Sequence, residues 1–226
     1  MGMVSAMSDN GPSSSAPDGQ SRGAEASPGP RLASQGVDVT VPARIVSSST
    51  VYRGAIFSVE DRRIALTGAD GHETMIRRQV VRHCPSVVML VHDEATDRYI
   101  LEREYRAGSD TFAYGLPAGL MDAGESVEHC ALRELREETG VVPDSADDMR
   151  FESAGDFYSS EGMTDELVHI LVLHLRAWHE VGRDFDPDEY VDSSWVDWPT
   201  LCASPIRESN AVIALQHEMI RRLRRT

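Results

Sequence analysis

The most informative stretch of this sequence is GLMDAGESVEHCALRELREETGV, which occupies residues 119–141. Ser126 is a residue type that caps helix N-termini, and Gly140 is the type that follows a helix in the left-handed conformation. Between them, Val127, Ala131 and Leu135 recur with helical spacing and form an apolar face. The stretch therefore predicts a helix between Ser126 and Gly140 whose apolar face packs on the core.

The predicted helix carries three glutamates on one face. Glu134, Glu137 and Glu138 stand at positions i, i+3 and i+4. Like charges at this spacing destabilise a helix by about 0.2–0.5 kcal/mol per pair, and a cation bound on the same face would reverse that effect. Carboxylate oxygens suit Mg²⁺ or Mn²⁺. From the helix pattern alone two interpretations stay open: a divalent cation site, or a solvated acidic face on which Arg133 and Arg136 form ion pairs.

The wider spacing favours the cation site. The stretch matches the pattern G-x5-E-x7-R-E-U-x-E-E-x-G-U, in which U is aliphatic, at all nine specified positions. It resembles the Nudix box, the signature of the Nudix hydrolases. Segments outside the box resemble the ADP-ribose pyrophosphatase branch of that family, and the resemblance covers roughly residues 45–223. These segments are Val51-Tyr52-Arg53-Gly54, Tyr105-Arg106, Leu116-Pro117-Ala118-Gly119 and Val212-Ile213-Ala214-Leu215.

The resemblance implies an α/β chain with the Nudix fold, a mixed β-sheet sandwiched between helices, and a small N-terminal antiparallel β subdomain. It also implies a set of metal ligands. Glu134 and Glu138 become direct ligands of Mg²⁺, Glu137 becomes a ligand of a second ion or of a bound water, and the main-chain carbonyl of Ala118 is a further ligand.

Two more residues of the box receive supporting roles from the same resemblance. Arg133 would orient the carboxylates and is counted among the catalytic residues. Glu125 would tie the loop to the helix. An ordinary helix ion pair is the alternative interpretation of Arg133.

In this branch the general base lies on a loop outside the box. The comparable acidic loop here is DFDPDEY, residues 184–190. Glu189, its last acid before the next strand, is the best match, and Asp186 and Asp188 are the alternatives. If none of them serves, Glu137 is the expected carrier of the proton. A solvated acidic loop is the competing interpretation.

Substrate contacts are expected from arginines and aromatic residues. Arg78 and Arg106 are the predicted phosphate contacts, since the forked guanidinium group matches phosphate oxygens and the chain has no lysine. Tyr52 and Phe57 are candidates for stacking on the base, although a core role suits them equally well. Arg78, Tyr52 and Phe57 lie in the N-terminal region, which in this branch crosses to a partner subunit. A homodimer is therefore implied.

The predicted activity is Mg²⁺-dependent hydrolysis (with Mn²⁺ as an alternative) of a nucleoside diphosphate sugar, with ADP-ribose giving AMP and ribose 5-phosphate. Two positions depart from the branch: Gly115 stands where a Glu is usual, and Glu161 stands where a Pro is usual. The Pro is one mark of ADP-ribose specificity in the branch, so its absence weakens the substrate assignment. Another nucleoside diphosphate sugar such as GDP-mannose, or a non-catalytic nucleotide sensor, are the alternatives. Glu166 is either another acid over the site or part of a solvated strand edge.

Composition and charge exclude several other classes of function. The formal net charge is −15 and all 22 basic residues are arginines. A negative field repels phosphate backbones, so nucleic acid is not the expected partner, and a Walker A loop requires a lysine. The three cysteines form no close pair, and no apolar run approaches the roughly 20 residues of a membrane span. A cytoplasmic protein without membrane contact is the expectation.

The rest of the chain is predicted to contain mostly strands. We expect a disordered leader at 1–36, the β subdomain at 37–84 and the hydrolase domain at 85–226. Strands are expected from turn signals and alternation, with two helical segments near the end. One or two strands are predicted within 39–52, and further strands at 56–66, 73–81, 86–91, 98–105, 111–116, 151–158, 167–175 and 190–196, with the helical segments at 198–201 and 210–223.

Overall fold

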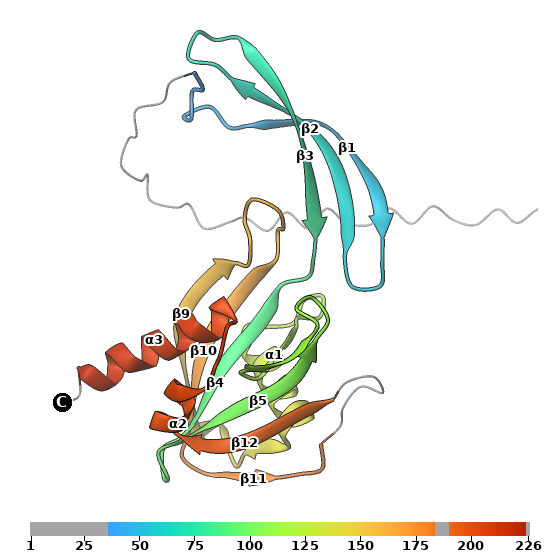
Figure 1. Cartoon of the computed structure of the whole chain (residues 1–226). Coiled ribbons are helices and arrows are strands. Elements are labelled where there is room, and N and C mark those ends of the chain that lie inside the picture. The colour runs from blue at the N-terminus through green and yellow to red at the C-terminus, as the bar shows by residue number, and fades with distance from the viewer. Residues whose placement is uncertain (1–35, 184–189, 225–226) are drawn as a thin grey trace, which may run out of the picture.

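The computed structural model describes residues 36–183 and 190–224 (Figure 1). Nearly all of the predicted disordered leader lies outside the described residues. The predicted acidic loop, with Glu189, Asp186 and Asp188, also lies outside them. No helix within the described ranges is long and apolar enough to cross a membrane.

A mixed sheet forms the centre of the larger part of the molecule. Its strand order is β12-β5-β4-β10-β9, with β6 paired to β5 and β7 paired to β4. The β4–β10 pair is parallel and the other pairs are antiparallel. The strands are β4 Ser86–Asp93, β5 Arg98–Arg106, β6 Thr111–Gly115, β7 Ala118–Leu120, β9 Met149–Tyr158, β10 Leu167–Leu175 and β12 Val191–Asp197.

Helices cover both faces of this sheet, as the α/β Nudix fold predicts (Figure 1). Successive side chains of a strand point to opposite faces. Val87 and Met89 of β4 pack with α1, Val127–Glu134, whereas Val88 and Leu90 pack with α3, Ser209–Leu223. All eight residues of β4 are buried. The short helix α2, Trp198–Ala203, adds Leu201 to the α3 side.

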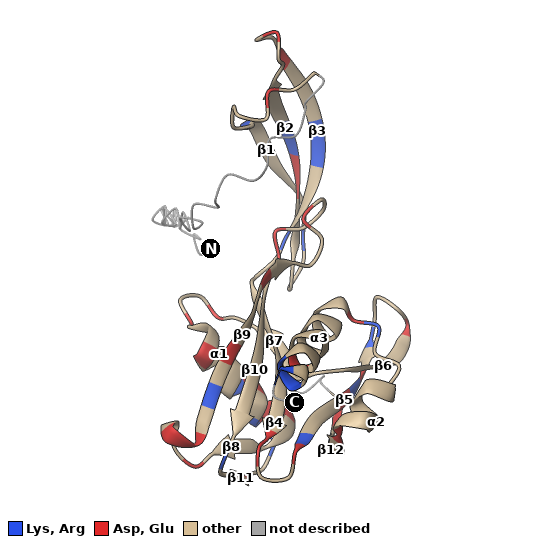
Figure 2. Ribbon diagram, turned by 90° about the vertical axis from the view of Figure 1, so that its left-hand side faces the viewer, with Lys and Arg blue, Asp and Glu red and all other residues tan. Residues whose placement is uncertain are grey.

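A second sheet is formed by the N-terminal strands. β1, Arg44–Arg53, β2, Ser58–Thr67, and β3, Glu73–Arg82, pair antiparallel in that order. The β2–β3 hairpin turns through Gly71 at φ +80°, in the region where the sequence predicts a turn. The sheet projects away from the larger part of the molecule (Figures 1 and 2), and β3 continues through a three-residue link into β4.

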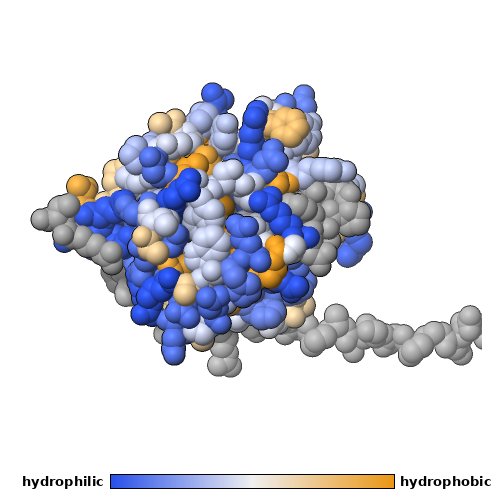
Figure 3. All heavy atoms as spheres, turned by 90° about the horizontal axis from the view of Figure 1, so that it is seen from below, coloured by the Kyte–Doolittle hydropathy of each residue, from blue (hydrophilic) through white to orange (hydrophobic). Residues whose placement is uncertain are grey.

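The N-terminal sheet exposes apolar side chains. Every residue of β1 is exposed, including Ile45 and Val51, which are more than half exposed. The opposite end of the molecule is covered mainly by hydrophilic residues (Figure 3). Close contact between the sheet and the larger part occurs at the end of β3, where Val81 N–H donates to the Met163 carbonyl at 2.8 Å. Arg82 also pairs with Asp165 there at 2.5 Å.

The predicted helix of the box is present but changes its geometry partway. Ser126 caps it by accepting from the His129 N–H, and Gly140 follows it at φ +74°, as predicted. The α-helix ends at Glu134, and Leu135–Thr139 form a π-helical turn, η1. Four short elements were not predicted: strand β7, the β8–β11 pair, Val141–Pro143 with Trp178–Glu180, and the 3₁₀ turn η2, Ala146–Asp148.

Candidate active site

The three box glutamates lie at the junction of α1 and η1. Glu134 and Glu138 are only 8% and 3% exposed, whereas the Glu137 side chain is 36% exposed. Burying a carboxylate is costly unless charges or hydrogen bonds compensate. Glu138 accepts from the Ala118 N–H at 3.1 Å, which joins the helix to strand β7. The fold therefore places two acids inside and one at the rim. A π-helical turn at this point fits a functional site, where such turns are frequent.

The position of Gly119 is fixed by the approach of Glu134. A Cβ built on Gly119 would stand 1.8 Å from Glu134 Cδ and 1.9 Å from Oε1. A side chain fits there only if the Glu134 carboxylate moves away, so the glycine of the box allows that carboxylate to lie directly against the β7 backbone. The neighbouring Ala118 is thereby held beside both buried glutamates.

Arg133 connects the acids to one another. Its Nη1 donates to Glu134 Oε1 at 2.7 Å and to Glu137 Oε2 at 3.0 Å. Its Nε and Nη2 donate to the two oxygens of Glu125, each at 3.1 Å, and Nη2 also donates to the Leu120 carbonyl. One guanidinium group thus orients two box carboxylates and fixes the loop before the helix.

Glu125 joins that loop to the helix through hydrogen bonds to both. It accepts from Arg133 and from the Asp122 N–H at 3.0 Å, and it pairs with His129 at 2.7 Å. The hydrogen bonds from Arg133, then from Asp122, lower the pKa of Glu125 to about 2. The same contact raises the pKa of the Arg133 guanidinium. The pair is therefore charged at every physiological pH.

A cavity of about 1120 Å³ opens in front of the box. Glu134, Glu137, Arg133, Ala118 and Gly119 line one part of its wall. Arg106, the predicted phosphate contact, also lines it, because it stands at the end of β5 beside the site. Its guanidinium pairs with Glu104 at 2.9 Å. The cavity thus brings together carboxylates that can hold a cation and a guanidinium group that can bind phosphate.

Some residues of the cavity were missed by the sequence analysis. Glu208, Arg207 and Tyr114 line it, and none of them lies in a recognisable motif. Burial raises the pKa of Glu208, and the charge of Arg106 opposes part of that rise. A Cβ on Gly115 would stand 3.3 Å from Glu208 Oε2, so this carboxylate lies beside the position where the branch usually has a Glu.

Glu166, left open between two interpretations, lies on the cavity wall. The Ser86 hydroxyl donates to its Oε1 at 3.1 Å. It is therefore an acid over the site, and the solvated-edge interpretation does not describe its position.

The structure does not bring the predicted contacts of the N-terminal sheet into the cavity of the same chain. Arg78 is exposed on β3 and donates to the Arg77 carbonyl at 2.9 Å. Tyr52 and Phe57 contact one another with ring centroids 5.6 Å apart and ring planes tilted by 41°. Ile56, one residue before Phe57, does line the cavity. The β1–β2 turn therefore reaches the cavity mouth, although its aromatic pair is not part of the wall.

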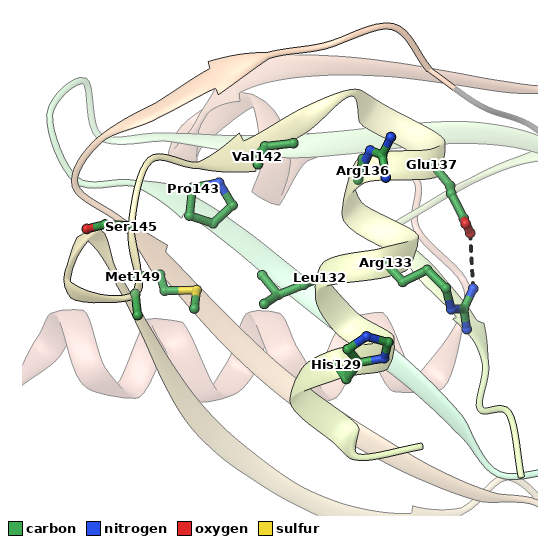
Figure 4. A pocket seen from close by; sticks show the side chains of 10 residues that line it. His129, Leu132, Arg133, Arg136, Glu137, Val142, Pro143, Ser145 and Met149 are labelled. Carbon is green, nitrogen blue, oxygen red and sulfur yellow. Dashed lines mark hydrogen bonds and ion pairs between the residues drawn. The ribbon is translucent and has the colours of Figure 1, made fainter. Parts of the chain in front are cut away.

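A smaller hollow of about 420 Å³ lies on another side of the box helix (Figure 4). Its lining includes Leu132, Val142 and Met149, and Glu137 is the one box acid on its wall. In Figure 4 the Arg133–Glu137 ion pair marks its edge. Because Glu134 and Ala118 line the larger cavity and not this hollow, the larger cavity is the candidate active site.

The residues around the box fit a divalent cation. Glu134, Glu137 and Glu138 offer carboxylate oxygens, and the close approach at Gly119 brings the β7 backbone beside them. Oxygen donors of this kind suit hard cations such as Mg²⁺ and Mn²⁺.

Comparison with known proteins gives consistent matches. A family profile described as the NUDIX domain matches residues 82–215. An ADP-ribose pyrophosphatase of Bacillus subtilis is 33% identical over 117 residues, covering 51% of this chain and 60% of that protein. The ADP compounds hydrolase NudE of Escherichia coli is 37% identical over 110 residues, covering 47% and 54%. An ADP-ribose pyrophosphatase of Escherichia coli O6:H1 is 32% identical over 156 residues, covering 66% and 71%.

The first of these relatives, from Bacillus subtilis, is matched over only 60% of its own length. Among solved structures, an ADP compounds hydrolase superposes with a TM-score of 0.60 at 21% identity. That superposition covers 87% of this chain and all of the other. At this identity the likeness supports the fold, including the N-terminal sheet, and no finer property.

Proposed function

The chain belongs to the NUDIX family, and from that membership we propose that it hydrolyses the diphosphate linkage of a nucleoside diphosphate sugar. The preferred substrate is ADP-ribose, which would give AMP and ribose 5-phosphate. The observation that carries the proposal is the shared cavity, whose wall holds box carboxylates together with Arg106 and Arg207. Relatives named ADP-ribose pyrophosphatase support the choice of substrate.

Four groups are proposed to hold Mg²⁺, with Mn²⁺ as an alternative: the carboxylates of Glu134, Glu137 and Glu138 and the main-chain carbonyl of Ala118. When bound, such cations neutralise diphosphate charge and lower the pKa of a water molecule. Arg133 keeps Glu134 and Glu137 oriented, since one guanidinium nitrogen contacts both.

Phosphate binding is assigned to arginines of the cavity. Arg106 lies on the wall with its guanidinium paired to Glu104, and a substrate phosphate would compete for the same group. Arg207 is a second phosphate contact on that wall. Arg78, Tyr52 and Phe57 remain proposed substrate contacts from the N-terminal sheet, through a second subunit.

Proton removal is assigned to an acid outside the helix. Glu189 is the proposed base, with Asp186 and Asp188 as alternatives on the same segment and Glu137 as the alternative within the box. Among the described residues, Glu166 also lines the cavity. A general base must come within hydrogen-bond distance of the attacking water. The residue that serves as the base must therefore at least lie on the wall of the cavity.

The proposed assembly is a homodimer formed through residues 37–84, with residues 85–226 as the hydrolase domain. The apolar residues exposed on β1 support this proposal. Exposed apolar patches of this kind mark interaction surfaces. A second chain would cover them and bring its β1–β2 turn and Arg78 toward the first chain's cavity.

Phosphate release from a panel of nucleoside diphosphate sugars tests the activity. The panel contains ADP-ribose and GDP-mannose, with a phosphatase coupled to convert the products to inorganic phosphate. Preference for ADP-ribose supports the full proposal. Preference for GDP-mannose favours a sibling specificity, which the departures at Gly115 and Glu161 allow.

The panel is run on the wild-type chain and on two variants. Glu138→Gln removes a proposed metal ligand, and Glu128→Gln is the matched control. Glu128 is an exposed acid of the same helix that does not line the cavity. If the wild-type chain binds nucleotide tightly but releases no phosphate, the proposed hydrolase function is wrong and a nucleotide sensor takes its place.

A further inference from the structure

Two buried histidines lie at the end of β4 opposite the active-site cavity. His92 of β4 and His174 of β10 are register partners in the parallel pair, and they are 5% and 1% exposed. Ser86, at the other end of β4, lines the active-site cavity. Ser86 and His92 are six positions apart, about 20 Å along a strand, and Val88, which also lines the cavity, is four positions or about 13 Å from His92. The histidines are therefore outside the site described above.

The two rings and one carboxylate converge. His92 Nδ1 lies 2.9 Å from His174 Nδ1, and Glu94 Oε1 lies 4.0 Å from the same His174 nitrogen. One ligand atom from each of these three residues falls within 4.8 Å of the others. The set has the composition of a two-histidine, one-carboxylate metal site.

The outward nitrogens of both rings face carboxylates. His92 Nε2 lies 2.9 Å from Asp97 Oδ1, and His174 Nε2 lies 3.6 Å from Glu152 Oε2. Histidines that bind metals usually donate the other ring N–H to a carboxylate or carbonyl, which fixes the tautomer. His92 has this outer partner within hydrogen-bond distance, whereas the Glu152 carboxylate lies just beyond that distance from His174, and the two Nδ1 atoms face each other.

Proton placement without a cation leaves one contact unfavourable. If both rings carry the proton on Nε2, two lone pairs face each other across 2.9 Å. If one ring carries it on Nδ1, that ring turns an unprotonated Nε2 toward a carboxylate. His174 Nε2 is a buried nitrogen without a hydrogen-bond partner, which matches the second case. A cation bound by both Nδ1 lone pairs, lying to one side of the line that joins them at about 2.0–2.1 Å from each nitrogen, would let both rings carry the proton on Nε2 and would remove the lone-pair repulsion.

The charges that face the cluster tolerate a cation. Four carboxylates and three guanidinium groups surround the rings, so the group carries one net negative charge while both histidines are neutral. The carboxylates are those of Glu94, Asp97, Glu152 and Glu218, and the guanidinium groups are those of Arg150, Arg221 and Arg222.

We propose that His92, His174 and Glu94 bind a divalent transition-metal ion of the Zn²⁺ type, separate from the cations of the active site. Nitrogen ligands suit Zn²⁺ and not Mg²⁺, which keeps to oxygen. Glu94 is partly exposed and provides the entry path, while the histidines hold the ion inside. The ion would join β4, β10 and the β4–β5 turn, so its role is structural.

Zinc content measured on the full chain tests the proposal. The protein is stripped with a chelator, dialysed against Zn²⁺ in a large excess of Mg²⁺ and analysed for bound metal. We expect one Zn²⁺ per chain that Mg²⁺ does not displace, and a higher Tm than the stripped protein. Glu138→Gln should retain this ion, which separates the result from the proposed hydrolase function.

Three variants localise the ion. Glu94→Gln, at a partly exposed position, should weaken Zn²⁺ binding at least tenfold while circular dichroism stays that of the wild type. His174→Asn should abolish binding. His179→Asn is the matched control, because His179 also pairs with an acid, Asp144 at 2.6 Å, but is exposed on β11 and is not part of the cluster. The proposal is overturned if no Zn²⁺ survives excess Mg²⁺, or if Glu94→Gln binds it as tightly as His179→Asn.

Discussion

Strands β4 and β1 lie at opposite extremes of burial. All eight residues of β4 are buried, and all ten residues of β1 are exposed. Both sequences are rich in residues that favour strands, so propensity does not separate them. The difference is in what covers them: helices pack on both faces around β4, whereas nothing in the described chain covers β1. The region around β4 can therefore organise a catalytic centre, and the region around β1 is suited to assembly.

The largest expected effect lies in the β4 region. We expect Glu138→Gln to lower turnover by two orders of magnitude or more, about 2.7 kcal/mol or more of transition-state stabilisation. The physical reason is that an amide cannot supply the anionic oxygen that a hard cation needs. Steady-state phosphate release at saturating Mg²⁺, with Glu128→Gln as the control, measures it. Turnover near that of the wild type would break the assignment of chemistry to this region.

The base should show nearly as large an effect. We expect Glu189→Gln to cut kcat strongly with little change in KM, the pattern of a group that acts in the transition state. Full kinetics of Glu189→Gln, Asp186→Asn and Asp188→Asn measure it. A larger effect at Asp186 or Asp188 would move the base along the segment. If none of the three costs more than about tenfold, roughly 1.4 kcal/mol, the acidic segment is not its source.

Changes in the N-terminal sheet should affect dimer formation more directly than the chemical step. Deleting residues 37–84 should give monomer or aggregate, because it removes the proposed interface. Val51→Arg, at a position 55% exposed on β1, is the milder test and should shift the mass seen by light scattering from dimer to monomer. A fragment of residues 86–226 that is soluble, does not aggregate and is fully active would show that the N-terminal sheet is not needed for assembly or function.

The smallest effect concerns the stability of the box. Glu125→Gln should cost about 1–2 kcal/mol of unfolding free energy, since it weakens a charge-assisted contact with Arg133. The pKa of Glu125 in the folded protein is about 2, below its ordinary value near 4.3. The contribution of Glu125 to folding stability is therefore fully present above about pH 4.3. It is lost as the pH falls from about 4.3 to about 2. Urea unfolding between pH 7 and pH 3 should show the variant losing less stability than the wild type.

Local signals in the sequence predicted much of the fold. Ser126 and Gly140 bound the box helix as expected, and the strands around β4 begin and end near the turn residues that predicted them. The π-helical turn at Leu135–Thr139 was missed, because the same residue types favour i+4 and i+5 backbone hydrogen bonding and no sequence pattern separates the two. The β8–β11 pair was missed because three residues are too few for a periodic pattern.

The candidate site was predictable where a motif carried it. The box residues were predicted from their spacing, and Arg106 from the resemblance of Tyr105-Arg106 to the branch in a chain without lysine. Glu208 was not predictable, because its approach to Gly115 depends on how α3 packs on the sheet. The same holds for His92 and His174, which are 82 positions apart in sequence and are brought together only by β4–β10 pairing. Long-range packing of this kind leaves no local signal.

Direct counting of bound cations tests the central claim, that the box carboxylates bind the catalytic metal. Electron paramagnetic resonance of Mn²⁺ titrated into the stripped protein measures binding without relying on turnover. We expect wild type and Glu128→Gln to bind Mn²⁺ alike, and Glu138→Gln to bind it at least tenfold more weakly. Equal Mn²⁺ binding by Glu138→Gln and Glu128→Gln, with both folded, would contradict the claim.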